Sequence, residues 1–246
     1  MFINIISMLY LIGTGISSDL TVKSVEELKS CDEVYLEKYT NPMIGERVAE
    51  IQQLIGKKIV VLEREKVESN FLVQRAEKAK VALLSSGDPL TATTHIALLV
   101  DARKKGIETK VFHNSSVYTA APGKAGLQIY RFGRTATLVN PRPNYAPTSS
   151  LEIIRQNLSL NMHSLVLLDT EPRPMEAIAA LEMLSEFKNA VVLSRLGEDD
   201  EQISYGQIAE LEKKALGSVP FTIIIPAKLH PVEEEHLDLI NKNKNK

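Results

Sequence analysis

Lys80–Gly106, KVALLSSGDPLTATTHIALLVDARKKG, is the stretch that decides the fold of this chain. It begins with a short apolar run at 81–84, turns at Ser85–Pro89 and continues from Ile96 with apolar residues at helical spacing. This order predicts a buried strand, a tight turn and a helix, which together form the first half of a βαβ unit. Ligands of open α/β sheets bind beyond the carboxyl ends of the strands, and Asp88 is predicted to lie at that edge.

The turn allows two interpretations of Asp88, a structural residue of the turn or a ligand contact. Gly87 supplies conformational freedom for the turn, and Pro89 fixes the backbone after it. A lone carboxylate in such a turn is more often a turn-former or a helix cap than a ligand contact, so the turn alone favours the structural role. His95, in the same segment, is expected to be a packed helix histidine.

The rest of the chain repeats the alternation of β-branched runs with amphipathic segments, which is typical of an α/β fold. Further strands are predicted at 8–12, 34–36, 59–62, 109–112, 135–139, 165–168, 190–193 and 221–225. Further helices are predicted at 20–28, 43–55, 67–78, 151–160, 175–187, 208–215 and 233–240.

A change of composition marks the predicted domain boundary. Residues 114–150 are rich in Gly and Pro, which predicts loops around short strands. The chain is therefore predicted to form two α/β domains with mainly parallel sheets, 1–113 and 114–246. Three arginines in the second segment, Arg131, Arg134 and Arg142, are interpreted as scattered surface charge, slightly ahead of a docking face for an acidic partner.

Composition limits the classes of function. The net charge of the 246 residues is −2, which gives no overall attraction to nucleic acid or to an anionic membrane. The chain has no apolar run long enough for a transmembrane helix. The apolar start lacks the basic region and cleavage site of a signal peptide, and residues 1–7 are interpreted as an extension. The single cysteine, Cys31, excludes an intramolecular disulfide, fits a cytoplasmic location and is expected to be a structural thiol.

Common cofactor and catalytic motifs are missing. Gly13-Thr14-Gly15 follows the first strand, but Ser18 stands where a dinucleotide-binding motif needs its third glycine, so NAD is disfavoured. The two glycines still permit the close approach of a flat ligand to the strand end. The five histidines form no zinc-binding pair, and no metal is expected.

Taken together, segments spread along nearly the whole chain resemble the diphthine synthases, a family in the tetrapyrrole-methylase-like class of S-adenosylmethionine-dependent methyltransferases. The most specific segments are SGDPLTATTH (86–95) and GLQIYRFGRTAT (126–137). The others, in order, are MLYLIGTGI (8–16), DLTVKS (19–24), VYLEKYT (34–40), LIGKK (54–58), HNSSVY (113–118), PTS (147–149), MHSLVLLD (162–169) and PAKLHPVE (226–233).

The resemblance implies two α/β domains with the cofactor, S-adenosyl-L-methionine, in the cleft between them, usually in a homodimer. It implies successive methylation of the amino group of 3-carboxy-3-aminopropyl-histidine, the modified histidine of translation elongation factor 2, during diphthamide biosynthesis. Elongation factor 2 is then the protein partner, with no direct contact to nucleic acid and no membrane.

The resemblance also implies a set of cofactor contacts. By position these are Ile16, Asp88, Thr91, Ser116, Val117, Leu168, Leu196 and Phe221. Phe221 stands where the family often has histidine, which suggests a contact through the backbone or a weakened one. The segment 170–174 is shorter than the family's usual loop, which would alter substrate access. Ser194 and Ala227 also depart from the family pattern without an expected effect.

Such a site is expected to need few catalytic groups. A sulfonium methyl donor carries its own activation, so the protein mainly aligns amine, methyl carbon and sulfur and excludes water. No metal or covalent nucleophile is required, no dedicated base is assigned, and Asp169, Glu171 and Tyr118 are candidates for assistance. Two alternatives stay open: a related methyltransferase that acts on a tetrapyrrole, corrinoid or ribosomal RNA, and a non-catalytic protein that binds S-adenosylmethionine.

Overall fold

The computed structural model describes residues 7–17, 19–40, 45–142 and 148–243. The chain divides into two compact units, Met1–Ser116 and Val117–Lys246, each with its own five-stranded sheet. The boundary expected from the sequence, after residue 113, differs from this division by the short segment 114–116. Among the described ranges, no helix combines the length and the hydropathy needed to cross a membrane.

The sheet of the first unit is entirely parallel, with the strand order β3-β2-β4-β1-β5. The strands are β1 (Met8–Gly13), β2 (Glu33–Glu37), β3 (Ile59–Leu62), β4 (Lys80–Ser85) and β5 (Glu108–Phe112). Their apolar, β-branched runs suit a sheet that is covered on both faces. Because all the strands are parallel, their carboxyl ends meet at one edge of the sheet.

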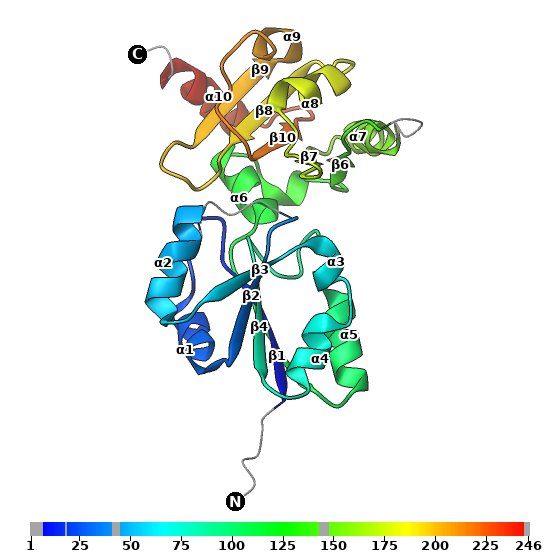
Figure 1. The fold of residues 1–246 in the computed structure, drawn as a ribbon. Coiled ribbons are helices and arrows are strands. Elements are labelled where there is room, and N and C mark those ends of the chain that lie inside the picture. The colour runs from blue at the N-terminus through cyan, green and yellow to red at the C-terminus, as the bar shows by residue number, and fades with distance from the viewer. Residues whose placement is uncertain (1–6, 18, 41–44, 143–147, 244–246) are drawn as a thin grey trace, which may run out of the picture. The chain divides into compact units, whose positions relative to one another are not determined.

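Helices cover both faces of this sheet, as Figure 1 shows. Helices α1 (Val22–Ser30) and α2 (Gly45–Ile55) lie on one face, and α3 (Arg64–Val67), α4 (Phe71–Ala76) and α5 (Ile96–Lys104) lie on the other. The single helix predicted over 67–78 is thus wrong in detail, because the chain forms two short helices there. Cys31 lies in the core, where burial raises the pKa of its thiol to about 12. The thiol therefore stays protonated near neutral pH, which agrees with a structural role.

The sheet of the second unit is mixed. Its strands are β6 (Ala136–Leu138), β7 (Ser164–Leu168), β8 (Asn189–Ser194), β9 (Gln202–Gln207) and β10 (Phe221–Ile225), in the order β6-β7-β10-β8-β9. The expectation of a mainly parallel sheet is wrong for this unit, since only β6 and β7 are parallel among these strands. The short connection between β8 and β9 forces antiparallel neighbours, and β10 runs opposite to both β7 and β8.

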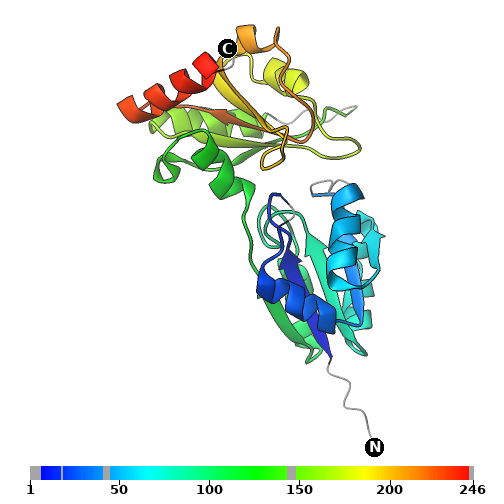
Figure 2. The same ribbon diagram turned by 90° about the vertical axis from the view of Figure 1, so that its left-hand side faces the viewer.

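Helices also cover both faces of the second sheet. One face carries α7 (Ser149–Ser159), α8 (Ala177–Met183) and α9 (Ile208–Leu211), and the other carries α6 (Val117–Lys124) and α10 (Pro231–Asn243) (Figure 2). A short 3₁₀ helix, η1 (Ile129–Arg131), follows α6. The loops predicted for 114–150 are therefore partly wrong, because α6 forms despite Pro122.

A buried carboxylate, that of Glu233, lies at the centre of a hydrogen-bond network in the second unit. Glu233, in α10, accepts hydrogen bonds from the backbone N–H of His230 at 2.7 Å and of Gln128 at 3.1 Å, and it pairs with Arg131. Arg131 also donates to the carbonyl oxygen of Lys228 at 2.6 Å. Arg131 thus belongs to an internal network, which contradicts its interpretation as scattered surface charge.

His163 completes this network from the start of β7. Its Nδ1 accepts the backbone N–H of Ala227 at 2.9 Å, so the ring proton lies on Nε2, which is 3.3 Å from Glu233 Oε1. Burial lowers the pKa of His163 below its ordinary value, although Glu233 acts in the opposite direction. Burial raises the pKa of Glu233, but hydrogen bonds from the backbone of His230 and Gln128 outweigh it and hold that pKa below the usual range.

We expect His163 to make the stability of the chain depend on pH. Below about pH 6.5 this histidine takes up a proton in the unfolded chain but stays neutral in the folded chain. The free energy of unfolding therefore keeps its full value above that pH and decreases as the pH falls. We measure the free energy of unfolding in urea at several values from about pH 5 to about pH 7, a range that brackets the ordinary pKa of histidine. The free energy of the His163→Gln variant should depend less steeply on pH than that of the wild type. Equal slopes for the variant and the wild type would contradict this role of His163.

Candidate functional site

The loops that follow β1 and β4 are joined by their backbones at the carboxyl edge of the first sheet. The N–H of Gly15 donates to the carbonyl oxygen of Gly87 at 3.0 Å, and the N–H of Gly87 donates back to Gly15 at 2.9 Å. A Cβ atom at Gly13 would lie 2.4 Å from the Gly87 carbonyl oxygen, so only glycine fits there. The glycines that suggested close backbone approach therefore serve first to bring two loops of the protein together.

Asp88 joins the loop after β4 to the loop after β5. Its Oδ1 accepts the backbone N–H of Leu90 at 3.0 Å and the hydroxyl of Thr91 at 3.2 Å. Its Oδ2 lies 2.7 Å from Nδ1 of His113 and accepts the backbone N–H of Asn114 at 3.3 Å. Because a carboxylate has about four acceptor directions, these contacts fill all of them. Asp88 is a turn-former, as the local sequence suggested, and it is also a link between two loops.

The electrostatics of Asp88 keep it ionised. Burial alone would raise its pKa, but the hydrogen bonds from Leu90, His113 and Asn114 outweigh this effect and hold the pKa of Asp88 below its usual value. The loop edge therefore carries a fixed negative charge near neutral pH.

The loop after β5 reaches back to β1. The amide of Asn114 donates to the carbonyl oxygens of Gly13 at 3.1 Å and Asp19 at 2.7 Å. The backbone N–H of Ile16 donates to the hydroxyl of Ser115 at 3.0 Å. Together with Asp88, these bonds hold three loops in one arrangement.

Four of the eight predicted cofactor contacts are thus gathered on one edge of the first sheet: Ile16, Asp88, Thr91 and Ser116. The backbone at Gly87 is open beside them, since a Cβ atom there would meet only the carbonyl oxygen of Ser115, at 3.7 Å. A bare backbone next to an ionised carboxylate is a fitting surface for a flat, cationic cofactor such as S-adenosylmethionine.

His95 lies beneath this edge as a packed residue, as expected. It is buried, with Nδ1 3.0 Å from the carbonyl oxygen of Pro89 and Nε2 3.1 Å from the hydroxyl of Tyr39. Burial lowers the pKa of His95, which favours the neutral ring. Its contacts support the turn that carries Asp88.

The other four predicted contacts belong to the second unit. The pairing of β10 with β7 and β8 brings Phe221 beside Leu168 and Ser194, and Leu196 follows two residues after β8. Val117 is the first residue of α6. Leu168, Leu196 and Phe221 therefore lie at one end of the second sheet, whereas the register does not place Val117 with them.

Of the residues expected to assist, Asp169 has a clear structural role. It follows β7, and its oxygens accept the backbone N–H groups of Asn140 at 3.0 Å and Glu171 at 3.1 Å. The carboxylate thus shapes the short loop that follows. Tyr118 lies in the first turn of α6.

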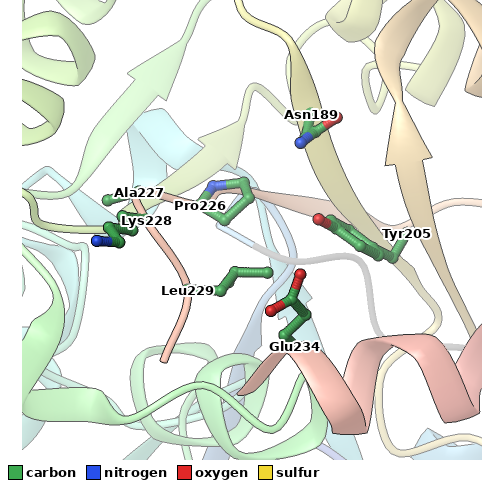
Figure 3. Close-up of a pocket in the computed structure, with 7 residues that line it drawn as sticks. All are labelled: Asn189, Tyr205, Pro226, Ala227, Lys228, Leu229 and Glu234. Atoms are coloured by element: carbon green, nitrogen blue, oxygen red, sulfur yellow. The ribbon is translucent and has the colours of Figure 1, made fainter. Parts of the chain in front are cut away.

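A separate hollow of about 350 Å³ opens at the other end of the second sheet (Figure 3). Tyr205 and Glu234 point into it beside Leu229. The hollow is lined by Asn189, Tyr205, Pro226, Ala227, Lys228, Leu229 and Glu234. Because Asn189 begins β8 and Pro226 follows β10, this end is opposite to the one with Phe221. None of the predicted contact residues lines the hollow.

The residues described show no group of three or more His, Cys, Asp and Glu side chains arranged to hold a metal ion. His113, for which no role is expected from the sequence, contacts Asp88. Its position directly after a predicted strand was a usable signal, because parallel strands bring their carboxyl ends to the same edge.

Comparison with known proteins defines the class of protein. The sequence profile of the tetrapyrrole (corrin/porphyrin) methylases matches residues 8–212, so the chain belongs to this class. The diphthine synthase of Methanothermobacter thermautotrophicus is 40% identical over 248 residues, which cover 94% of each chain. That of Methanocaldococcus jannaschii is 37% identical over 96% of this chain and its own full length.

A solved structure agrees with this assignment. A crystal structure of diphthine synthase superposes with a TM-score of 0.89 at 34% identity, covering 95% of this chain and 96% of the other. Within the tetrapyrrole methylases, the chain belongs to the diphthine synthase family.

The Gly13–Gly87 junction predicts an asymmetric response to alanine. Gly13→Ala should lower the free energy of unfolding by about 2 kcal/mol or more, because the new Cβ meets rigid backbone. Gly123→Ala is the matched control, since a Cβ there meets nothing within 4 Å and α6 gains helix propensity. The control should be neutral or up to about 1 kcal/mol more stable in urea unfolding followed by circular dichroism. Equal stability of the two variants would contradict the close packing at Gly13.

Proposed function

We propose that this chain is an S-adenosyl-L-methionine-dependent methyltransferase of diphthamide biosynthesis. It successively methylates the amino group of 3-carboxy-3-aminopropyl-histidine in translation elongation factor 2. The observation that carries the proposal is the interlocked loop edge around Asp88, in a chain that belongs to the diphthine synthase family. The edge offers what a sulfonium cofactor needs: bare backbone, a fixed negative charge and loops held in one arrangement.

The role we propose for Asp88 is specific. Its acceptor directions are filled by the protein, so it acts by fixing the loops that carry Thr91 and Ser116 and by placing negative charge near a cationic cofactor. Ile16 contributes backbone at the same edge. Further contacts are proposed from the second unit, through Val117, Leu168, Leu196 and Phe221, whose apolar side chains leave their backbone as the polar surface.

The cofactor, when bound, supplies an activated methyl group on a positively charged sulfur. The protein therefore needs to hold the acceptor amine in line with that methyl group and to let the amine lose a proton. Neither task requires a metal or a covalent intermediate.

The same family membership supports elongation factor 2 as the protein substrate. We further propose, from the resemblance in sequence, that the enzyme acts as a homodimer in the cytoplasm. The single buried cysteine is consistent with a reducing compartment.

Methyl transfer can be measured directly. The purified chain is incubated with radiolabelled S-adenosylmethionine and elongation factor 2 that carries the unmethylated intermediate. We expect label on the modified histidine, with mass increases of one methyl group at a time. Label on a corrinoid or on ribosomal RNA instead, or binding of the cofactor without transfer to any of these, would contradict the proposal.

Removal of the Asp88 carboxylate should weaken the cofactor site. Asp88→Ala loses four hydrogen bonds to a charged group, and we expect S-adenosylmethionine to bind at least ten times more weakly by calorimetry. Asp101→Ala is the control, since this half-exposed carboxylate pairs with Lys104 in the same helix, and the variant should bind S-adenosylmethionine as tightly as the wild type. Circular dichroism establishes that both variants are folded. Unchanged cofactor binding by folded Asp88→Ala would count against the assignment.

A further inference from the structure

His113 directly follows β5 and presents its imidazole at the loop edge described above. Its Nδ1 lies 2.7 Å from Oδ2 of Asp88, a short hydrogen bond between a ring and a carboxylate. The two side chains differ sharply in burial: that of Asp88 is 9% exposed, whereas that of His113 is 67% exposed. One side of the imidazole is therefore anchored to the protein while the rest of the ring faces outward.

The ionised state of Asp88 fixes the position of the ring proton. Because hydrogen bonds hold the pKa of Asp88 below its usual range, the carboxylate only accepts, and Nδ1 of His113 must carry the proton that forms the bond. In the neutral ring the lone pair then lies on Nε2, on the far side of the imidazole from Asp88. The exposed side chain leaves Nε2 open to solvent and to an incoming group.

The anchor is rigid. Oδ1 of Asp88 is held by Leu90 and Thr91, and Oδ2 is also held by the backbone of Asn114, so the carboxylate cannot turn away from the ring. Among the described residues, the charged side chain in contact with His113 is that of Asp88. Nε2 of His113 has no protein partner in the part of the chain that the structure describes. A histidine that is oriented by a carboxylate through one nitrogen and has the other nitrogen available is the arrangement of a general base.

We propose that His113 is the general base that deprotonates the acceptor amine. This inference rests on the proposed function, in which the substrate is an amine that is largely protonated near neutral pH. His113 is suitably placed, because it bonds to one proposed contact residue, Asp88, and precedes another, Ser116, in the same loop.

Nε2 of His113 takes one proton from the substrate ammonium, and the lone pair released on the amine nitrogen forms the new bond to the methyl carbon. The carbon–sulfur bond breaks and its electron pair stays on sulfur, which becomes a neutral thioether. The imidazolium then gives its proton to solvent, to which its exposed ring has access, and the base is ready for the next methyl group.

Asp169 is a weaker candidate for this role. Its two oxygens accept the backbone N–H groups of Asn140, after β6, and of Glu171, after β7, and no histidine is oriented by it among the described residues. Asp88 and His113 together combine an anchored charge with an exposed, basic nitrogen, which a lone carboxylate in a loop does not.

The test uses His113→Asn as its main variant. An asparagine amide offers Asp88 a hydrogen-bond donor in place of Nδ1 but has no basic nitrogen, so a merely positional role would survive the change. We measure single-turnover methyl transfer to elongation factor 2 carrying the unmethylated intermediate, together with S-adenosylmethionine affinity by calorimetry. At pH 7 the variant should transfer about 100 times more slowly with its cofactor affinity unchanged.

The pH profile and chemical rescue separate a base from a structural residue. The deficit of His113→Asn should shrink as the pH rises, because the amine then loses its proton to solvent without help. Added imidazole should restore part of the rate of His113→Ala. A full rate for His113→Asn overturns the inference, and so does a loss that is equal at every pH and accompanied by weaker cofactor binding. Absence of transfer by the wild type overturns the proposed function itself, and this inference with it.

Discussion

The carboxylate of Asp88 is the interaction on which the candidate site depends. It is an ionised group, nearly buried, and it is satisfied by two loops that are distant in sequence. Loss of either loop's donors would leave one oxygen of this nearly buried carboxylate without partners, which is costly, so the carboxylate and the loops stabilise one another. The glycine junction at Gly13 and Gly87 adds the third loop at a distance that any larger residue would prevent. The result is a fixed surface of backbone and charge, and a fixed surface is what the alignment of an already activated methyl donor requires.

The second unit uses the same pair of chemical groups to a different end. Glu233 and His163 also form a carboxylate–histidine contact, but both side chains are buried, and Nδ1 of His163 is occupied by the backbone of Ala227. That pair therefore holds loops together and has no nitrogen left for chemistry. His113 differs because its ring is exposed and because the carboxylate takes Nδ1, which leaves Nε2 available. Burial and the choice of bonded nitrogen, rather than the identity of the two residues, separate a structural pair from a reactive one.

The sequence predicted the first sheet well because apolar strands and amphipathic segments alternate there without interruption. Two elements of the second unit were not predicted because their local composition is untypical. Helix α6 contains Pro122 and the neighbouring glycine, and the edge strand β9 is polar and has no apolar run. The mixed order of the second sheet depends on where β10 inserts, which no local pattern encodes. Asp88 was found because it lies in a recognisable turn. Its contact with His113 spans 25 residues and arises only when parallel strands bring both loops to one edge.

The claim that the loop edge around Asp88 holds the methyl donor is tested most directly by a crystal structure of the chain with S-adenosylhomocysteine, the demethylated form of that donor. We predict electron density for the ligand against the backbone of Gly87 and the loops that carry Ile16, Thr91 and Ser116, with the Asp88–His113 contact intact. Density for the ligand elsewhere, for example in the hollow lined by Tyr205 and Glu234, with the loop edge around Asp88 empty, would contradict the claim.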